Sequence, residues 1–189
     1  MRTFIFGSSF NPVHTGHLFI VQEVMCQLGY GRAILVPANI ASHKENHTMI
    51  TPQERLEMLH AAVDNIPGCI VEECDIKRGG ITYSIDTIHY ILEHYDITGK
   101  PGFIIGDDLL PGFGTWKKPD EIKKLVDLID VHRNEEECIE SKYPDFYIKN
   151  KMLPISSTEI RERVKKGYPI KYLVPEKVRE IIEQRSFYR

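Results

Sequence analysis

The sequence has few cysteines and no excess charge of one sign. Its 189 residues include four cysteines, none of which stands in a Cys-x-x-Cys pair. Cys69 and Cys74 lack a second ligand pair, so a structural zinc site is not expected, and so low a cysteine density does not require a disulfide framework. With 24 Lys+Arg against 27 Asp+Glu, the net charge is −3. That balance argues against a general nucleic-acid-binding protein.

Long apolar runs are also missing. No uninterrupted run approaches the roughly 18 residues of a membrane span, and the N-terminus reads as a core strand without the apolar region and cleavage site of a signal peptide. We therefore expect a cytoplasmic protein that binds neither membranes nor nucleic acid. A composition of 42% hydrophobic and 27% charged residues is typical of a globular chain with one sizeable core.

Short apolar runs alternate with segments of helical period, which predicts a parallel sheet built from βαβ units. Strands are expected at residues 3–6, 33–37, 70–76, 103–106, 128–131 and 147–153, and helices at 17–28, 51–66, 84–95, 119–125, from about 157 and from 175. Residues 107–116 are expected to form a loop, and residues 134–144 an exposed loop or short helix. The fold class is therefore α/β, a doubly wound Rossmann-like parallel sheet. We expect a single domain over residues 1–189 with a small helical C-terminal tail.

Two of these helices carry strong start signals. Thr51 is followed by a proline at the first helical position and by Glu54, the reciprocal partner of a capping box. A second capping box, from Ser156 to Glu159, opens the helix near residue 157.

The loop after the first strand carries the strongest chemical signal. It reads Gly7-Ser8-Ser9-Phe10-Asn11-Pro12-Val13-His14-Thr15-Gly16-His17, which is neither a dinucleotide fingerprint nor a P-loop. Two imidazoles three residues apart lie on one face of a first helical turn, where backbone N–H groups and the helix dipole favour an anion. This arrangement suits a phosphate. A metal site on the two histidines is the weaker alternative, because no carboxylate or cysteine stands beside them.

His14-Thr15-Gly16-His17 resembles the signature of the HxGH nucleotidyltransferase superfamily, and residues 155–161 are similar to its ISSTxIR segment. Within that superfamily the sequence most resembles the bacterial nicotinate-nucleotide adenylyltransferases, nearly end to end. The resemblance implies adenylyl transfer from ATP to nicotinate mononucleotide, which gives deamido-NAD and pyrophosphate in NAD biosynthesis. It also implies magnesium carried on the ATP phosphates, with no protein metal ligand. Further matching segments are His43-Lys44, residues 54–59, 80–87 and 103–108, Trp116, Arg133 and residues 172–175.

The resemblance also implies roles for individual residues. His14 and His17 would donate hydrogen bonds to the α-phosphate of ATP, and the planar guanidinium of Arg161 would clamp a phosphate. The residues implied for ATP binding are Gly7, Ser8, Ser9, Phe10, Gly16, Gly106, Asp108, Arg133, Ser156, Ser157 and Thr158, and those for the nicotinate nucleotide are Asn11, Lys44, Tyr83, Ser84 and Trp116.

Several of these residues have ordinary structural alternatives. Trp116 is predicted to stack on the pyridine ring, but an isolated tryptophan also serves as a core or surface anchor. Ser84 and nearby N–H groups would hold the substrate carboxylate, or form an ordinary helix cap. A carboxylate site built from donors disfavours the amide, whose NH₂ is itself a donor. Among the candidate binding-site residues Arg55 is the weakest, because an arginine on a helix is usually a surface residue paired with a neighbouring charge.

The chain departs from the family pattern at Ser8, where glycine is usual, and in residues 40–44, which lack the usual prolines. Ser84, Asp107 and Lys117 also differ, and they surround the expected pyridine pocket. An adenylyltransferase for nicotinamide mononucleotide and a nucleotide-binding module without turnover therefore remain alternatives. The sequence is also compatible with a homo-oligomer.

Overall fold

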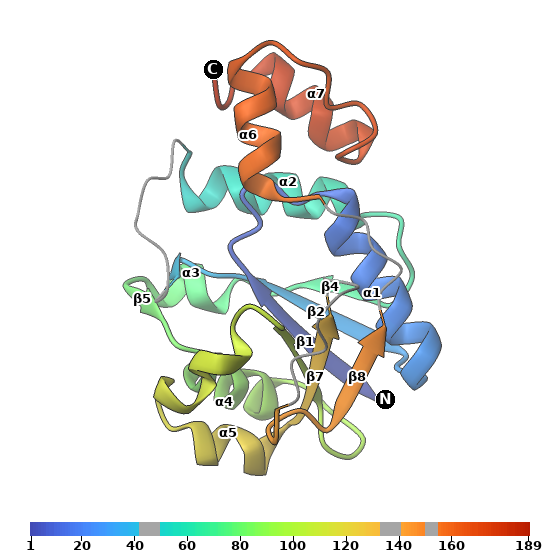
Figure 1. The fold of residues 1–189 in the computed structure, drawn as a ribbon, viewed down its shortest axis with the longest axis vertical. Coiled ribbons are helices and arrows are strands. Elements are labelled where there is room, and N and C mark those ends of the chain that lie inside the picture. Colours follow the sequence, from blue (N-terminus) through green and yellow to red (C-terminus); the bar gives the residue numbers. More distant parts are fainter. Residues whose placement is uncertain (42–49, 133–140, 150–154) are drawn as a thin grey trace.

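The structure is a computed structural model that describes residues 1–41, 50–132, 141–149 and 155–189. In these parts of the chain, six parallel strands form one sheet in the order β4-β2-β1-β6-β7-β8 (Figure 1). This confirms the predicted doubly wound α/β class. The strands are β1 (Thr3–Ser8), β2 (Arg32–Pro37), β4 (Cys69–Val71), β6 (Gly102–Gly106), β7 (Asp127–His132) and β8 (Phe146–Lys149), and a separate parallel pair joins β3 (Ile40–Ala41) to β5 (Ile81–Thr82).

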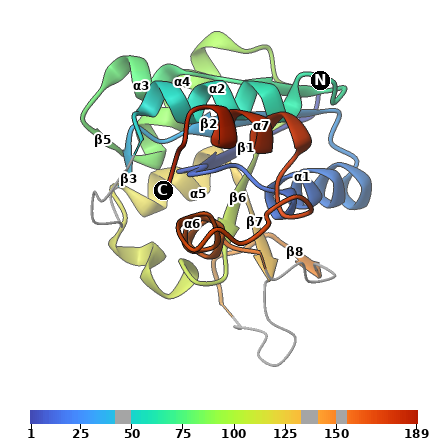
Figure 2. The ribbon, with the colours of Figure 1, turned by 90° about the horizontal axis from the view of Figure 1, so that it is seen from above.

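Helices cover both faces of the sheet. They are α1 (Thr15–Leu28), α2 (Pro52–Val63), α3 (Cys74–Arg78), α4 (Ser84–His94), the 3₁₀ helix η1 (Leu110–Thr115), α5 (Pro119–Leu125), α6 (Ser157–Lys165) and α7 (Glu176–Gln184). Seen from above, α2 and α7 run side by side over one part of the sheet (Figure 2). None of the helices in the described residues combines the length and apolar character that crossing a membrane requires.

Side chains alternate along the strands and so build two cores. Phe4 and Phe6 of β1 face the core formed with α1, α2, α6 and α7, whereas Ile5 faces the core formed with α4 and α5. Successive side chains of a strand point to opposite faces, so a strand covered on both sides needs apolar residues at every position. That requirement explains why the strands read as short continuous apolar runs.

The chain order creates a topological switch beside β1. After β1 the chain builds β2 and β4 on one side of it, and it then returns to build β6, β7 and β8 on the other side. In open sheets of this type, ligands bind beyond the carboxyl ends of the strands at such a switch point. The C-terminal helices α6 and α7 stand at this end of the sheet (Figure 1).

One predicted strand is wrong in its second half. Residues 70–76 alternate like a strand, but β4 ends at Val71 and α3 begins at Cys74. The helical turn brings Arg78 back onto the carboxylate of Asp75, three residues earlier, and it buries Cys74 and Asp75. An alternation of apolar and polar residues over only seven residues is too short to distinguish a strand from a strand followed by one helical turn.

The other differences concern element ends. Helix α1 starts at Thr15, two residues before the predicted start at His17, and α2 ends at Val63, before the predicted end at residue 66. The predicted loop 107–116 contains η1, which is anchored by the buried Leu110 and Phe113. The described part of the last predicted strand is β8, and residues 133–140 and 150–154 lie outside the described residues.

The capping box of α2 supports a stability prediction. The Glu54 N–H donates to Oγ1 of Thr51 over 3.2 Å, and the Thr51 N–H donates to Oε2 of Glu54 over 2.6 Å. Thr51→Ala should lower the free energy of unfolding by about 1 kcal/mol and the melting temperature by about 2–4 °C. Thr51→Ser keeps the acceptor and should melt close to the wild type. Calorimetric melting of the two variants checks this, and an equal decrease in both would contradict the role of the hydroxyl.

Candidate active site

Hydrogen bonds to two carbonyl oxygens fix the backbone of the loop after β1. The carbonyl oxygen of Ser8 accepts from the N–H of Ala38 over 2.9 Å, and the carbonyl oxygen of Ser9 accepts from Nη1 of Arg55 over 2.5 Å. In a trans peptide the C=O and the following N–H point in opposite directions. The N–H groups of Ser9 and Phe10 therefore point away from these donors. Several N–H groups presented together form a binding surface for anions.

Arg55 joins two loops that follow neighbouring strands. Its side chain comes from α2, is 1% exposed, and also donates from Nη2 to the carbonyl oxygens of Ala38 and Asn39, over 2.7 and 3.0 Å. Burial lowers the pKa of the guanidinium, because desolvation disfavours its charged form. The surface position considered for Arg55 from the sequence is therefore wrong. The residue is a buried clamp behind the loops after β1 and β2.

His14 and His17 stand at the start of α1, as their spacing predicted. His14 is the N-cap residue, and the two imidazole centroids lie 3.7 Å apart, with both residues about 95% buried (5% and 4% exposed). The backbone N–H of His14 donates to Nδ1 of His17 over 3.2 Å. A neutral imidazole whose Nδ1 accepts carries its proton on Nε2, so His17 offers an Nε2–H donor.

Gly16 and Phe10 determine how the two rings pack. A Cβ at Gly16 would lie 3.0 Å from Nδ1 and 3.1 Å from Cε1 of His14, so a side chain at position 16 would displace that ring. The ring of Phe10 packs against His17 at a centroid distance of 4.9 Å and is 1% exposed. Phe10 has a φ of 46°, a left-handed conformation that costs about 1 kcal/mol or more for a bulky residue. The buried packing of its ring offsets this strain.

Helix α6 closes the loop from the opposite side. Nη1 of Arg161 donates to the carbonyl oxygen of Asn11 over 2.7 Å, and Nη2 donates to Oγ1 of Thr158 over 3.2 Å. The Ser157 hydroxyl donates to the carbonyl oxygen of Pro12 over 2.9 Å, and the Ser156 hydroxyl accepts from Glu159 over 3.1 Å as the helix cap. The structure therefore brings the second sequence motif against the first.

Asn11 lies between the loop and the last residues of the chain. Its Oδ1 accepts from the Tyr188 hydroxyl over 2.8 Å, across 177 residues of sequence. Burial raises the pKa of Tyr188, so the phenol remains a donor at neutral pH. Asn11 is 8% exposed, and both oxygens of this residue are used within the protein. The sequence contains no local signal for the Tyr188 contact.

A cavity of about 180 Å³ opens at the carboxyl ends of the strands. Its walls come from β1, β2, β5, β6 and β7, from α1, α3 and α4, and from the loops that follow the strands. It contains many of the residues implied by the resemblance. These are Gly7, Ser8, Ser9, Gly106, Asp108, Ser84 and Trp116.

A second cavity, of about 280 Å³, shares Ser84 and Trp116 with the first and is also lined by Tyr83 and Lys117. The Trp116 ring packs edge-on to Phe103 and tilted to Phe113, at centroid distances of 6.4 and 5.3 Å. Ser84 begins α4 directly after Tyr83, its N-cap residue. A flat ring with an anionic substituent fits between such an aromatic side chain and the first turn of a helix.

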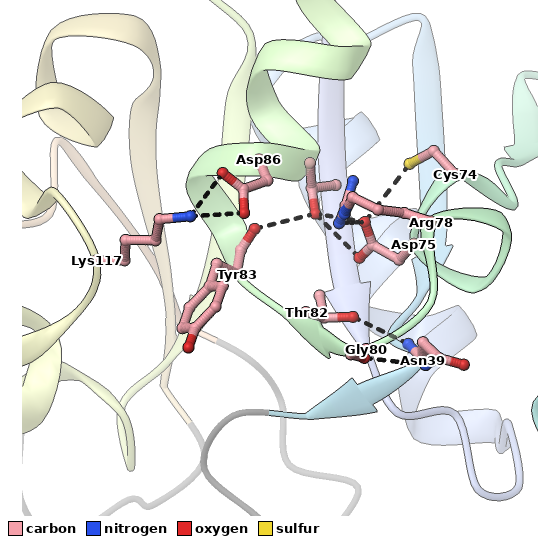
Figure 3. A network of polar contacts seen from close by, with 10 residues as sticks. Asn39, Cys74, Asp75, Arg78, Gly80, Thr82, Tyr83, Asp86 and Lys117 are labelled. Carbon is pink, nitrogen blue, oxygen red and sulfur yellow. Dashed lines mark hydrogen bonds and ion pairs between the residues drawn. The ribbon is translucent and has the colours of Figure 1, made fainter.

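Asp75 is a buried residue of the first cavity that sequence reasoning missed. Its carboxylate accepts from the Thr87 hydroxyl over 2.8 Å and pairs with the Arg78 guanidinium (Figure 3). Burial raises the pKa of Asp75, while the bonds from Thr87 and Arg78 act in the opposite direction. Thr87 lies 12 residues further along the chain. Only the packing of α3 against α4 brings the two side chains together.

Gly106 and Asp108, which line the first cavity, depend on each other. A Cβ at Gly106 would collide with Oδ1 of Asp108, so this glycine allows the Asp108 side chain to fold back over the strand end. Lys44 and Arg133 lie outside the described residues. Their predicted contacts with phosphate and ATP stay predictions.

A family model described as cytidylyltransferase-like matches residues 5–163 of the chain. A protein of Borrelia garinii named "Probable nicotinate-nucleotide adenylyltransferase" is 39% identical over 188 residues, which cover 100% of this chain and 95% of that protein. A protein of the same name from Treponema pallidum is 34% identical and is covered completely, as is this chain. The solved structure of Plasmodium falciparum nicotinic acid mononucleotide adenylyltransferase complexed with NaAD has a TM-score of 0.76 at 18% identity, covering 100% of this chain and 98% of that one.

The buried clamp makes a second stability prediction. Arg55→Met leaves one buried and two partly buried carbonyl oxygens without their donor, and an unpaired buried acceptor costs about 1–3 kcal/mol. We expect the free energy of unfolding to fall by about 2–5 kcal/mol and the melting temperature by about 5–15 °C.

Arg185→Met is the matched control in the same assay. Arg185 also contacts α2, through an ion pair with Glu57 over 2.8 Å, but its side chain is 49% exposed. Removing an exposed pair should change the melting temperature by less than about 3 °C. Equal shifts in the two variants, measured by calorimetry, would show that burial of Arg55 is not what stabilises the loops.

Proposed function

Because the chain belongs to the cytidylyltransferase-like family, and within it to the nicotinate-nucleotide adenylyltransferases, we propose that it transfers the adenylyl group of ATP to nicotinate mononucleotide. The products are deamido-NAD and pyrophosphate. The observation that carries this proposal is the close His14–His17 pair at the start of α1, with ring centroids 3.7 Å apart, beside the switch point of the sheet.

The proposed reaction needs no covalent nucleophile from the protein. A phosphate oxygen of nicotinate mononucleotide attacks the α-phosphorus of ATP, a new P–O bond forms, and the bond to pyrophosphate breaks. Catalysis of such a transfer consists mainly of positioning the substrates and stabilising the charge that develops on the phosphoryl oxygens. Donors that are fixed before the substrates bind are therefore the groups to identify.

The Nε2–H of His17 is one such donor, because its tautomer is set by the backbone N–H of His14. The His14 ring packs against the His17 ring at a tilt of 35° and adds a second imidazole at the same helix end. The N–H groups of Ser9 and Phe10 extend the donor set along the loop. We assign the α-phosphate of ATP to this corner, where the dipole of α1 also favours negative charge.

Helix α6 extends the donor set toward the outer phosphates. Arg161 and Ser157 touch the loop after β1, so an ATP bound there lies within reach of the α6 N-terminus. The guanidinium of Arg161 is held by Asn11 and Thr158 in one orientation. Such a group provides a planar, pre-oriented clamp for phosphate oxygens.

We propose that magnesium accompanies the ATP phosphates. Among the described residues, no three His, Cys, Asp or Glu side chains meet in a group suited to a metal ion. A cation held mainly by phosphate oxygens and water, as is usual for Mg²⁺, therefore fits the donor set better than a cation held by the protein. Bound in this way, it would neutralise phosphate charge.

The acceptor nucleotide is assigned to the second cavity, with its ring against Trp116 and its carboxylate toward Ser84. The solved structure complexed with NaAD has the same fold and is named for the same activity, which supports an acid rather than an amide acceptor here. A neutral amide at this position would direct its own N–H groups at the donors of α4.

Pyrophosphate release is the direct test. With ATP and nicotinate mononucleotide we expect magnesium-dependent release that stops when the metal is chelated. Release should be weaker with nicotinamide mononucleotide. His17→Ala removes an oriented donor and should lower kcat by about 10²-fold or more.

His94→Ala is the control, since His94 stacks on Tyr90 at the exposed end of α4 and should leave kcat unchanged. Preference for the amide would keep the reaction and reverse the acceptor. No release with any acceptor would favour a nucleotide-binding module without turnover.

Gly16→Ala tests the packing of the two imidazoles. The added methyl group meets the His14 ring at 3.0 Å and should displace it, so we expect kcat to fall about tenfold or more with little change in melting temperature. Gly112→Ala is the matched control, because a Cβ there meets no atom within 4 Å. Full activity of Gly16→Ala in steady-state kinetics would show that the ring position of His14 does not matter.

A further inference from the structure

Two carboxylates border the first turn of α4, and each is paired with a cation (Figure 3). The buried Asp75 pairs with Arg78. Asp86, in the first turn of α4, accepts from Nζ of Lys117 with both of its oxygens, over 3.1 and 2.9 Å. Each of these two carboxylates therefore has a cationic partner.

Lys117 reaches this position from the segment between η1 and α5. Its Nζ lies 4.7 Å from the centroid of the Tyr83 ring, and the residue lines the cavity that also contains Ser84 and Trp116. Its side chain is 43% exposed and that of Asp86 is 35% exposed. The ion pair thus lies at the edge of the pocket assigned to the acceptor nucleotide.

The charge of Asp86 has opposite effects on the helix and on the substrate. A carboxylate in a first turn stabilises its own helix through the dipole. A second carboxylate, brought to the same turn by a substrate, would be repelled by it. Lys117 cancels this repulsion, because its ammonium contacts both oxygens of Asp86. Nicotinate and nicotinamide mononucleotide differ in this pocket by one negative charge, so the cancellation affects only the acid.

We propose that Lys117 is a specificity-determining residue that allows the pocket to accept the acid by neutralising Asp86. The inference rests on the proposed function, since it concerns the acceptor of that reaction. An exposed ion pair contributes little to folding stability. The effect of removing Lys117 should therefore appear in acceptor selectivity and not in the melting temperature.

Lys117→Gln is the first variant. It leaves the Asp86 charge uncompensated, and we expect kcat/KM for nicotinate mononucleotide to fall about fivefold to tenfold, while the value for nicotinamide mononucleotide changes by less than about twofold. The decrease should shrink as salt is added, because exposed charges are screened. Lys118→Gln is the matched control. Its side chain pairs with Glu121 over 2.9 Å, and neither acceptor should be affected.

The double variant Lys117→Gln/Asp86→Asn is the decisive one. Removing the uncompensated carboxylate should restore kcat/KM for the acid to within about twofold of the wild-type value. A structural role of the ion pair predicts no restoration, since the pair is already broken in Lys117→Gln. Calorimetric binding of both mononucleotides gives the same comparison without turnover.

The outcomes separate this inference from the function on which it rests. If the wild type releases no pyrophosphate with either acceptor, the proposed function fails and the selectivity role fails with it. If the wild type is active, a loss shared equally by acid and amide in Lys117→Gln overturns the inference alone. Failure of Asp86→Asn to restore the acid also overturns it.

Discussion

The buried guanidinium of Arg55 is the interaction on which the site depends. It connects three carbonyl oxygens from the loops after β1 and β2, and none of these partners is charged. Nη1 and Nη2 carry these bonds, and a buried cation depends on such partners for its stability. The loops are therefore held in one geometry. Because the Ser9 carbonyl accepts from Arg55, the following N–H of Phe10 points away from Arg55.

The C-terminal helices complete this constraint from the other side. Arg161 and Tyr188 both donate hydrogen bonds to Asn11. Arg161 donates to its carbonyl oxygen and Tyr188 to its side-chain oxygen. The amides of α1 are also joined to this region, since the N–H of Thr15 donates to the carbonyl oxygen of Leu173. The helical tail is thus part of the site. Without it, the segment between Phe10 and His14 would lack the partners of its carbonyl groups.

Near the acceptor pocket, carboxylates of the protein are paired with cations. Asp75 and Asp86 each meet a cation, so the charges of these two carboxylates are compensated. Helix α3 supplies both Asp75 and Arg78. The sequence predicts that residues 70–76 form a strand, so this helix was not expected. The one clear error in the predicted fold therefore falls on an element that shapes the pocket. Such conflicts between local pattern and structure are expected at functional positions.

The sequence by itself determined the sheet, most helix starts and the HxGH corner. These features depend on residues three or four apart, such as Thr51 with Glu54 and His14 with His17, or on the apolar content of a single strand. Only the tertiary structure decided what Arg55, Asp75 and Tyr188 do, because the partners of Arg55 and Tyr188 lie up to 46 and 177 residues away. The role of such a buried polar group depends on its hydrogen-bond partners, which are distant in the sequence. No local pattern in a single sequence records them.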